Sequence, residues 1–337
     1  MPFRTITGHS RVLSLLSAAI ARDSLPPALL MAGPSGVGKR LAAIAVAQAF
    51  NCLQPTASPE FPRDACGECA SCRRIARGVH PDVILVEPGD SGSIKIEQLR
   101  DVIDRAQYRP FEGKRRVVII DHADAAGADA QSALLKTLEE PPSASTFILV
   151  SSIPDALLQT VLSRCPRLRF GPLTPAEVAR VLIDEHGYAE QDARAAAADA
   201  DGSVGRALEA GGEDLTDARA AAQRVLEETA RNDDPVRRIG LARALTEGKG
   251  TPAEERNRLA VRLRSMGSLL RDVGVLAGHG DLAMLANADL ESRLEKLASS
   301  YDATRALRAY AAVDRALVAL DRNASPKVVA DWLLLEL

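Results

Sequence analysis

The sequence GPSGVGKR, from Gly33 to Arg40, follows directly after the apolar run ALLMA at 28–32. It fits the phosphate-binding pattern G-x-x-x-x-G-K-[ST] at every position except the last, where Arg40 replaces a hydroxyl side chain. Between a strand and a helix, such a turn gathers backbone amides around a phosphate, and its lysine reaches the outer oxygens. The residues expected to contact a nucleotide here are Gly33, Gly36, Gly38, Lys39 and Arg40. The alternative is a glycine-rich turn that only packs.

A second catalytic element is expected in VVIIDHAD at 117–124, where Asp121 follows four apolar strand residues. This is the place of a carboxylate that holds Mg²⁺, but His122 stands where a glutamate would orient the attacking water. Arg40 also removes the hydroxyl that ligates the metal ion, because a guanidinium cannot coordinate a cation. With both positions altered, we expect a site that has lost ATP hydrolysis. For His122, a packing role is favoured over that of a replacement base.

Four of the five cysteines fall in one stretch of the chain. Cys52 precedes CGECASC, which holds Cys66, Cys69 and Cys72, whereas Cys165 lies far away. Two overlapping C-x-x-C units with a fourth thiol upstream form a metal pattern rather than a disulfide pattern. Four thiolates suit a closed, tetrahedral, structural zinc site. Free surface thiols and an iron–sulfur cluster are the alternatives, and no redox partner motif supports the cluster.

Apolar runs alternate with helical patterns through residues 1–170. Short β-rich runs bounded by Gly, Pro or charge stand at 28–32, 82–88, 115–124 and 145–152, as in buried parallel strands. Helical patterns lie between them, for example at 41–50 and 128–140. The expected fold class is therefore α/β, a wound parallel sheet covered by helices on both faces.

The pattern becomes entirely helical near residue 171. Thr174 is predicted to cap a helix, with Pro175 at its first position and Glu177 closing a capping box. This helical segment runs to about 211, where GGED at 211–214 marks a joint before a longer helical region. We therefore predict three domains: 1–170, which includes the cysteine module at 52–72, then 171–211 and 212–337.

Composition narrows the functional classes. With 46% hydrophobic and 26% charged residues and a net charge of −3, the 337 residues form an ordinary globular protein without a basic field that attracts nucleic acid. Basic groups at 73–77 and 114–116 are interpreted as solvated faces. No run of eighteen apolar residues and no export leader are found, so a cytoplasmic protein without a membrane partner is expected.

A combination of motifs points to one family. GPSGVGK, the cysteine quartet, VVIIDHAD, LLKTLEEPP and LSRC closely resemble the delta-prime subunits of bacterial DNA polymerase III clamp loaders, which are AAA+ proteins. The resemblance runs nearly end to end, through DGSVGRAL at 201–208 to the terminal NASPKVVADWLLLEL. LLKTLEEPP and SRC are shared with the gamma/tau motor subunits. The resemblance implies an AAA+ core, a small helical lid domain and an all-α collar domain that joins a helical pentamer.

The resemblance also implies residue roles. It assigns zinc binding to Cys52, Cys66, Cys69 and Cys72. Arg164, near the end of the long helical stretch PDALLQTVLSRC at 154–165, corresponds to an arginine finger offered in trans to a neighbour's nucleotide. Arg206 corresponds to the sensor arginine of the lid domain. A surface ion pair is the alternative for Arg164.

The function implied is that of a largely non-hydrolysing subunit. It completes the loader ring with gamma/tau and delta subunits while the sliding clamp is loaded onto primer-template DNA. The implied ligands are structural Zn²⁺ and, weakly, ATP or ADP with Mg²⁺. The second hypothesis is an active gamma/tau-like motor ATPase, against which Arg40 and His122 argue. A nucleotide kinase is a distant third, because nothing resembles an acceptor-substrate lid.

Overall fold

The computed structural model describes residues 1–89, 92–210, 215–232, 234–248, 252–282, 285–287, 290–321 and 324–337. The chain divides into two compact units, Met1–Leu173 and Thr174–Leu337. The joint predicted at 211–214 lies outside the described residues. Within the described ranges, no helix combines the length and the apolar character that a membrane crossing requires.

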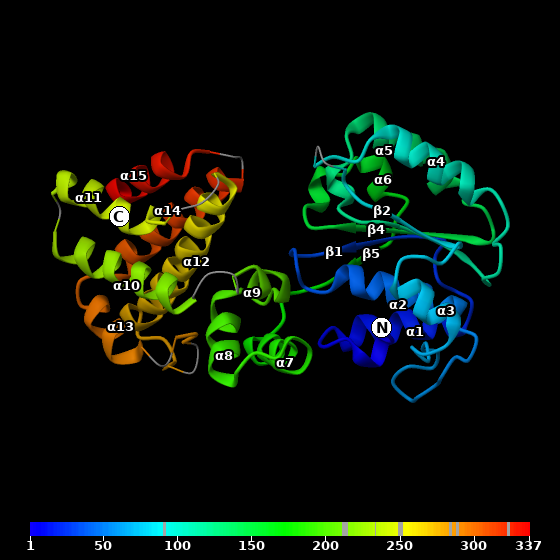
Figure 1. Cartoon of the computed structure of the whole chain (residues 1–337), viewed down its shortest axis with the longest axis horizontal. Helices are drawn as coiled ribbons and strands as arrows, with labels where there is room; N and C mark the ends of the chain where they lie inside the picture. Colours follow the sequence, from blue (N-terminus) through cyan, green and yellow to red (C-terminus); the bar gives the residue numbers. More distant parts are fainter. Residues whose placement is uncertain are drawn as a thin grey trace. The chain divides into compact units, whose positions relative to one another are not determined.

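A five-stranded parallel sheet forms the centre of the first unit (Figure 1). Its strand order is β2-β3-β4-β1-β5. The strands are β1 Ala28–Ala32, β2 Val83–Val86, β3 Arg116–Ile120, β4 Ser145–Ser151 and β5 Arg167–Arg169. The first four confirm the predicted runs. The edge strand β5 was not predicted, because it places a half-buried leucine between two exposed arginines instead of forming an apolar run.

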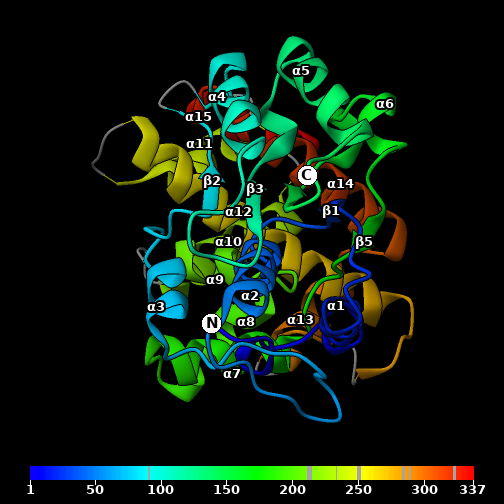
Figure 2. The same cartoon turned by 90° about the vertical axis from the view of Figure 1, so that its right-hand side faces the viewer.

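Helices cover both faces of this sheet (Figures 1 and 2). They are α1 Ser10–Ala21, α2 Lys39–Asn51, α3 Ala70–Ala76, α4 Ile96–Ala106, α5 Ala128–Glu139 and α6 Gln159–Leu162. The helices α1, α2 and α3 share an apolar core with Leu29 and Met31 of β1. On the opposite face, α4, α5 and α6 pack with Leu30 of the same strand, because successive strand residues point to opposite faces. The predicted α/β fold, with a sheet covered on both sides, is thus confirmed.

The segment before Arg164 is less helical than predicted. Instead of one long helix, it forms a 3-10 turn at Pro154–Ala156 and the single short helix α6. The break lies at Leu157 and Leu158, whose backbones are extended. The apolar side chains of this segment still face the core, since Leu157 and Val161 are buried in it. Packing against the sheet, rather than helix length, therefore positions the segment.

The described part of the second unit is helical throughout. Its helices are α7 Pro175–His186, α8 Glu190–Asp199, α9 Val204–Ala210, α10 Leu215–Arg231, α11 Pro235–Thr246, α12 Pro252–Ala277, α13 Glu291–Ala298, α14 Ala303–Asp321 and α15 Pro326–Glu336. The predicted capping box is confirmed: Oγ1 of Thr174 accepts the Glu177 amide at 3.3 Å, and the Thr174 amide donates to Oε2 of Glu177 at 2.8 Å. Residues from α10 to α15 share one apolar core, in which Tyr301 hydrogen-bonds Thr229 at 2.9 Å.

Candidate nucleotide site and metal centre

The glycine-rich loop joins the end of β1 to the start of α2, as its pattern requires. Gly36 and Gly38 adopt φ angles of 72° and 99°, which only glycine adopts readily. At Gly33 the constraint is space, because a Cβ there would lie 2.0 Å from the carbonyl oxygen of Phe170. Three of its glycines are thus required by the backbone path.

The lysine of this loop is bonded to the loop itself. The Nζ atom of Lys39 donates to the carbonyl oxygens of Gly33 at 2.7 Å and Pro34 at 2.5 Å. Burial lowers the pKa of Lys39, and the nearby carboxylates of Asp121 and Asp124 oppose that shift. A phosphate would have to replace these carbonyl partners.

Arg40 makes ion pairs in the place expected for a metal ion. Its guanidinium contacts Glu87, just after β2, and Oδ2 of Asp121 at 3.4 Å. Asp121 is buried at the end of β3, and its other oxygen accepts the amide of His122. A cation of the protein therefore already balances the carboxylate that would hold Mg²⁺. The side chain of His122 is exposed, so the packing role favoured for it is wrong.

Sequence reasoning missed three side chains near the loop. Besides Glu87, the ring of His9 contacts the Val37 carbonyl through Nε2 at 2.9 Å, and Asp124 accepts the amide of Ser152 at 3.0 Å. Asp124 stands in the quoted VVIIDHAD run and could have been noticed there. His9 and Glu87 carry no local pattern, because only the fold brings them to the loop.

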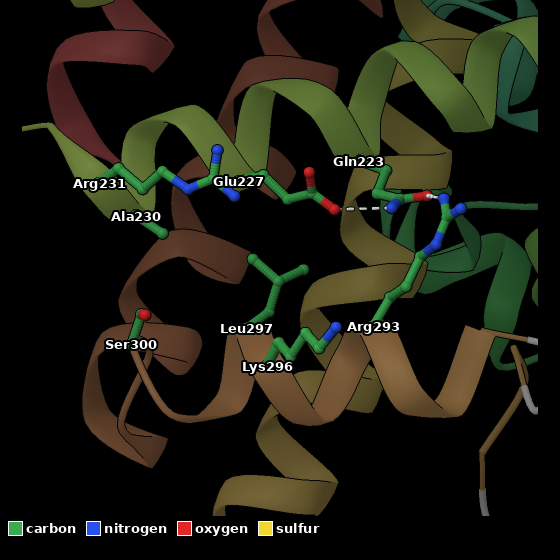
Figure 3. A pocket seen from close by; sticks show the side chains of 8 residues that line it. All are labelled: Gln223, Glu227, Ala230, Arg231, Arg293, Lys296, Leu297 and Ser300. Carbon is green, nitrogen blue, oxygen red and sulfur yellow. Dashed lines mark hydrogen bonds between the residues drawn. The ribbon is translucent and has the colours of Figure 1, made fainter.

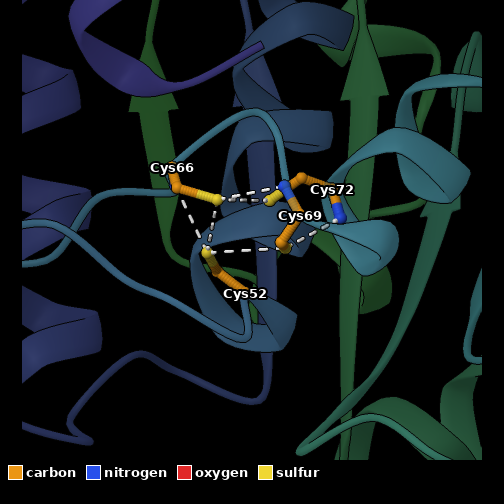
Figure 4. Close-up of side chains that lie close together, drawn as sticks. All are labelled: Cys52, Cys66, Cys69 and Cys72. Carbon is orange, nitrogen blue, oxygen red and sulfur yellow. Dashed lines mark hydrogen bonds between the residues drawn. The ribbon is translucent and has the colours of Figure 1, made fainter.

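The four cysteines Cys52, Cys66, Cys69 and Cys72 converge at the end of α2 and the start of α3 (Figure 4). All four sulfur atoms lie within 4.8 Å of one another. The sulfur of Cys52 is 3.5 Å from that of Cys66 and 4.0 Å from that of Cys69. Four thiolates around zinc at about 2.3 Å would be about 3.8 Å apart. The sulfur positions therefore fit a tetrahedral zinc ion.

Backbone amides point at these sulfur atoms. The amide of Cys66 donates to Cys52 at 3.2 Å, that of Cys69 to Cys66 at 3.3 Å, and that of Cys72 to Cys69 at 3.4 Å. Burial raises the pKa of Cys52 and Cys72. Burial also acts on Cys69, but hydrogen bonds from the amides of Cys72 and Leu53 outweigh it and lower its pKa to about 6. Hydrogen bonds of this kind stabilise the thiolate form that a metal requires.

The N-terminal residues hydrogen-bond to the cysteine module, and these contacts were not predicted from the sequence. Asp64 is buried and accepts the amide of Phe3 at 2.8 Å and the Arg4 guanidinium at 3.0 Å. The same guanidinium donates to the carbonyl oxygens of Ala65 at 2.7 Å and Cys66 at 2.9 Å. A charged residue early in the chain thus orients the segment that carries Cys66.

The two predicted arginines have protein partners. Arg164 follows α6, is partly exposed, and pairs with Glu139 at the end of α5 at 2.8 Å. Arg206 belongs to the second unit and pairs with Asp201 at 3.4 Å, and both residues line a pocket of about 240 Å³. The structure therefore brings the loop together with Asp121 and gathers the cysteine quartet. Arg164 forms a surface ion pair, which was the alternative to an arginine finger in the interpretation of the sequence.

The second unit contains another pocket, of about 390 Å³, between α10 and α13 (Figure 3). Arg293 donates to Gln223 at 3.2 Å, and Gln223 donates to Glu227 at 2.7 Å. These polar groups satisfy one another across the pocket. None of the site residues predicted from the sequence lines it.

Residues 8–174 match the family model described as DNA polymerase III, delta subunit. The DNA polymerase III subunit delta' of Bacillus subtilis is 39% identical over 175 residues, 52% of this chain and 51% of that protein. The subunit delta' of Pseudomonas aeruginosa is 37% identical over 171 residues, 49% of this chain and 50% of that protein. The subunit tau/gamma of Haemophilus influenzae is 33% identical over 181 residues, 53% of this chain and 25% of that protein.

The chain spans about half the length of the delta' relatives it matches. Among solved structures, a gamma subunit-related protein of Thermotoga maritima is similar over 96% of this chain and 97% of that chain. The sequence identity is 16% and the TM-score is 0.45.

Proposed function

Because this chain belongs, through residues 8–174, to the family of DNA polymerase III delta' subunits, we propose that it acts as a largely non-hydrolysing clamp-loader subunit. In this proposal it completes a ring with gamma/tau and delta subunits while the sliding clamp is loaded onto primer-template DNA. Residues 1–170 serve as the AAA+ domain, 171–211 as the lid and 212–337 as the collar that assembles the ring.

The ion pairs of Arg40 are the observation that carries this proposal. Hydrolysis needs a metal ion beside the γ-phosphate, held by a hydroxyl and a carboxylate. Here a guanidinium stands in place of the hydroxyl and pairs with the carboxylate of Asp121. ATP or ADP would bind weakly through the loop amides and Lys39, without an ordered Mg²⁺ and without turnover. Arg206 is proposed to sense such a nucleotide from the lid.

We propose that Arg164 acts on a nucleotide bound by a neighbouring subunit. It stands partly exposed after α6, and its pair with Glu139 is a surface ion pair of the kind that contributes little. A γ-phosphate offers a stronger, bidentate partner for a guanidinium. Arginine fingers supplied in trans raise the hydrolysis rate by roughly 10³ to 10⁵.

The test is a loader reconstituted with Arg164→Ala in place of the wild-type chain. The variant should assemble and keep its zinc, while the DNA- and clamp-stimulated ATPase of the whole loader falls. Arg194→Ala is the matched control, because Arg194 also forms an exposed ion pair, with Glu190. Equal ATPase and equal clamp loading with Arg164→Ala and wild type would return Arg164 to a surface role.

An active motor of the gamma/tau kind is the second candidate, supported by the glycine backbone and by Lys39 of the loop. It predicts steady ATP hydrolysis by the isolated chain, abolished by Lys39→Ala. Turnover at motor-like rates would replace the first proposal by this one. Negligible turnover that is unaffected by Lys39→Ala would reject it.

For the cysteine quartet we propose one structural zinc ion, held by all four thiolates. The sulfur spacing and the amide hydrogen bonds support this ligand. A closed set of four protein ligands leaves no position for a reacting water, so the zinc would order residues 52–72 rather than catalyse. Elemental analysis of gently purified protein should find one zinc per chain.

A further inference from the structure

The pocket of about 390 Å³ between α10 and α13 carries more positive than negative charge. Its lining includes the cationic side chains of Arg231, Arg293 and Lys296 and one carboxylate, that of Glu227. The volume lies within the range of about 300 to 1,000 Å³ that is typical of small-molecule sites. Because the whole chain has a net charge of −3, this excess of cations is a local property of the pocket.

The two cations of α13 belong to one face of that helix. Arg293 and Lys296 are three positions apart, a spacing that places two side chains next to each other on a helix surface. Both side chains point across the pocket toward α10 (Figure 3). Leu297, which also lines the pocket, is buried in the apolar core of the second unit. The packed part of α13 therefore fixes the positions from which the two cations extend.

These cations have few partners within the protein. Among the described residues, the side chain of Arg293 hydrogen-bonds only to Oε1 of Gln223, at 3.2 Å, and the side chain of Lys296 has no hydrogen bond or ion pair. Arg231 pairs with Glu228 at 3.6 Å, and both residues are exposed. A guanidinium has five N–H donors and an ammonium group has three. Most donors of Arg293 and Lys296 are therefore available to a ligand.

The carboxylate of the pocket is held on the opposite wall. Gln223 is buried on α10, and its side-chain nitrogen donates to Glu227 at 2.7 Å. In the part of the chain that the structure describes, Glu227 forms no ion pair with Lys296. The wall formed by α13 therefore keeps its positive charge, and an anion is expected to bind on that side of the pocket.

We propose that this pocket binds the diphosphate group of a small anion. Guanidinium groups bind phosphate oxygens through paired hydrogen bonds, and a lysine adds a point charge. Two linked phosphoryl groups can contact Arg293 and Lys296 at the same time, which a single phosphate does less well. The lining includes no residue of the nucleotide loop, the cysteine quartet or the arginine finger, so this site goes beyond the proposed function. Its failure would leave that function intact.

The test is a calorimetric titration of the full chain with inorganic pyrophosphate. Every sample carries Lys39→Ala, so that the glycine-rich loop lacks its phosphate-binding lysine, and this chain is the reference. Adding Arg293→Gln/Lys296→Gln should weaken binding about tenfold or more. Adding Arg243→Gln/Arg308→Gln is the matched control, because it removes the same charge from exposed positions outside the pocket. This control should bind pyrophosphate as the reference does.

Glu227→Gln, added to the same reference, should have the opposite effect. It removes the negative charge of the pocket and keeps an oxygen that can accept the hydrogen bond from Gln223. Pyrophosphate should therefore bind about threefold or more tightly. A side chain with a purely structural role would not strengthen binding when it is changed. The unfolding temperatures of all these variants should stay close to that of the reference, because the substituted side chains lie outside the apolar core.

Two further probes, ADP and inorganic phosphate, identify the ligand more closely. ADP binding at least as tightly as pyrophosphate would support the proposal with a nucleoside diphosphate as the ligand. Weaker binding of ADP would support it with a free diphosphate. Inorganic phosphate binding as tightly as pyrophosphate would overturn the choice of a diphosphate.

Three other results would overturn the site itself. They are no binding of pyrophosphate by the reference at millimolar concentration, equal affinity of the reference and Arg293→Gln/Lys296→Gln, and equal losses in the two double variants. If Arg293→Gln/Lys296→Gln kept its affinity for pyrophosphate but assembled less well with gamma/tau and delta subunits, the occupant would instead be a carboxylate of a neighbouring subunit.

Discussion

The cysteine quartet and the glycine-rich loop are two binding patterns in one unit, and their polar groups are used differently. The sulfur atoms of the quartet face a common centre, and their hydrogen bonds come from nearby amides and from one another. In the loop, Lys39 bonds to two carbonyl oxygens, and Arg40 pairs with Glu87 and Asp121. A binding pattern in the sequence therefore predicts its ligand best where the folded chain keeps the ligand-binding atoms of that pattern available to the ligand.

Loss of the metal should produce the largest effect and tests one side of this comparison. Cys52→Ser removes one of four thiolates, and structural zinc contributes on the order of 10 kcal/mol to local folding. We expect less than stoichiometric zinc and new protease cleavage within 52–78, measured by elemental analysis and limited proteolysis. Cys165→Ala is the control and should keep its zinc, because Cys165 lies outside the quartet. Full zinc content and unchanged protease resistance in Cys52→Ser would reject the metal centre.

The buried ion pair of Asp82 and Arg116 extends the comparison to charged side chains whose role is to stabilise the fold. Asp82→Ala would leave Arg116 buried without its carboxylate partner. It would also leave the backbone amides of Phe111, Glu112 and Gly113 without the acceptor they have in the wild type. Removing one partner of a buried ion pair lowers the free energy of unfolding by about 3 to 5 kcal/mol. Unfolding of Asp82→Ala should therefore begin at a clearly lower urea concentration than unfolding of the wild type. Asp23→Asn removes the charge of the exposed partner of Arg115 and suits the left-handed backbone at this position, so it should change stability by less than about 1 kcal/mol. Equal effects of the two substitutions would contradict the role given to Asp82.

Arg40→Thr tests the other side of the comparison, with a smaller expected effect. It restores the hydroxyl of the phosphate-binding pattern and releases Asp121 from its ion pair. Binding of ATP with Mg²⁺ should strengthen about tenfold, or about 1.4 kcal/mol, in a titration followed by fluorescence or calorimetry. Arg40→Lys keeps the positive charge and should bind as wild type does. Equal gains from Thr and Lys would mean that Arg40 does not block the metal position.

The smallest expected effect is on the pH dependence of folding stability in acid. Burial opposes ionisation of Asp82, but three backbone amides and Arg116 hold its pKa below the ordinary value of 3.8. A carboxyl with a lowered pKa stabilises the fold above its unfolded pKa, and that contribution is lost as the pH falls through the folded pKa. The stability difference between wild type and Asp82→Asn should therefore narrow below about pH 3.8. A difference that stays constant or widens there, in unfolding curves, would contradict this reading.

Local patterns were enough to predict the quartet, the four apolar strands and the Thr174 cap, since each is encoded within a few neighbouring residues. Contacts between distant positions could not be predicted in this way. Glu87 lies 47 positions from Arg40, and Asp82 lies 34 positions from Arg116. The break before α6 was also missed, because its apolar spacing suits a long helix as well as two short turns packed on a sheet.

The strand β5 has a consequence for solubility. A sheet edge offers unpaired backbone groups that another chain can join, and proteins commonly prevent this with short edge strands and charge. The edge strand here has three residues, Arg167–Arg169, and both arginines are exposed. Two such edges brought together would face each other with like charges. The two arginines that keep this strand from showing an apolar pattern are therefore the same residues that disfavour edge-to-edge association at this edge of the sheet.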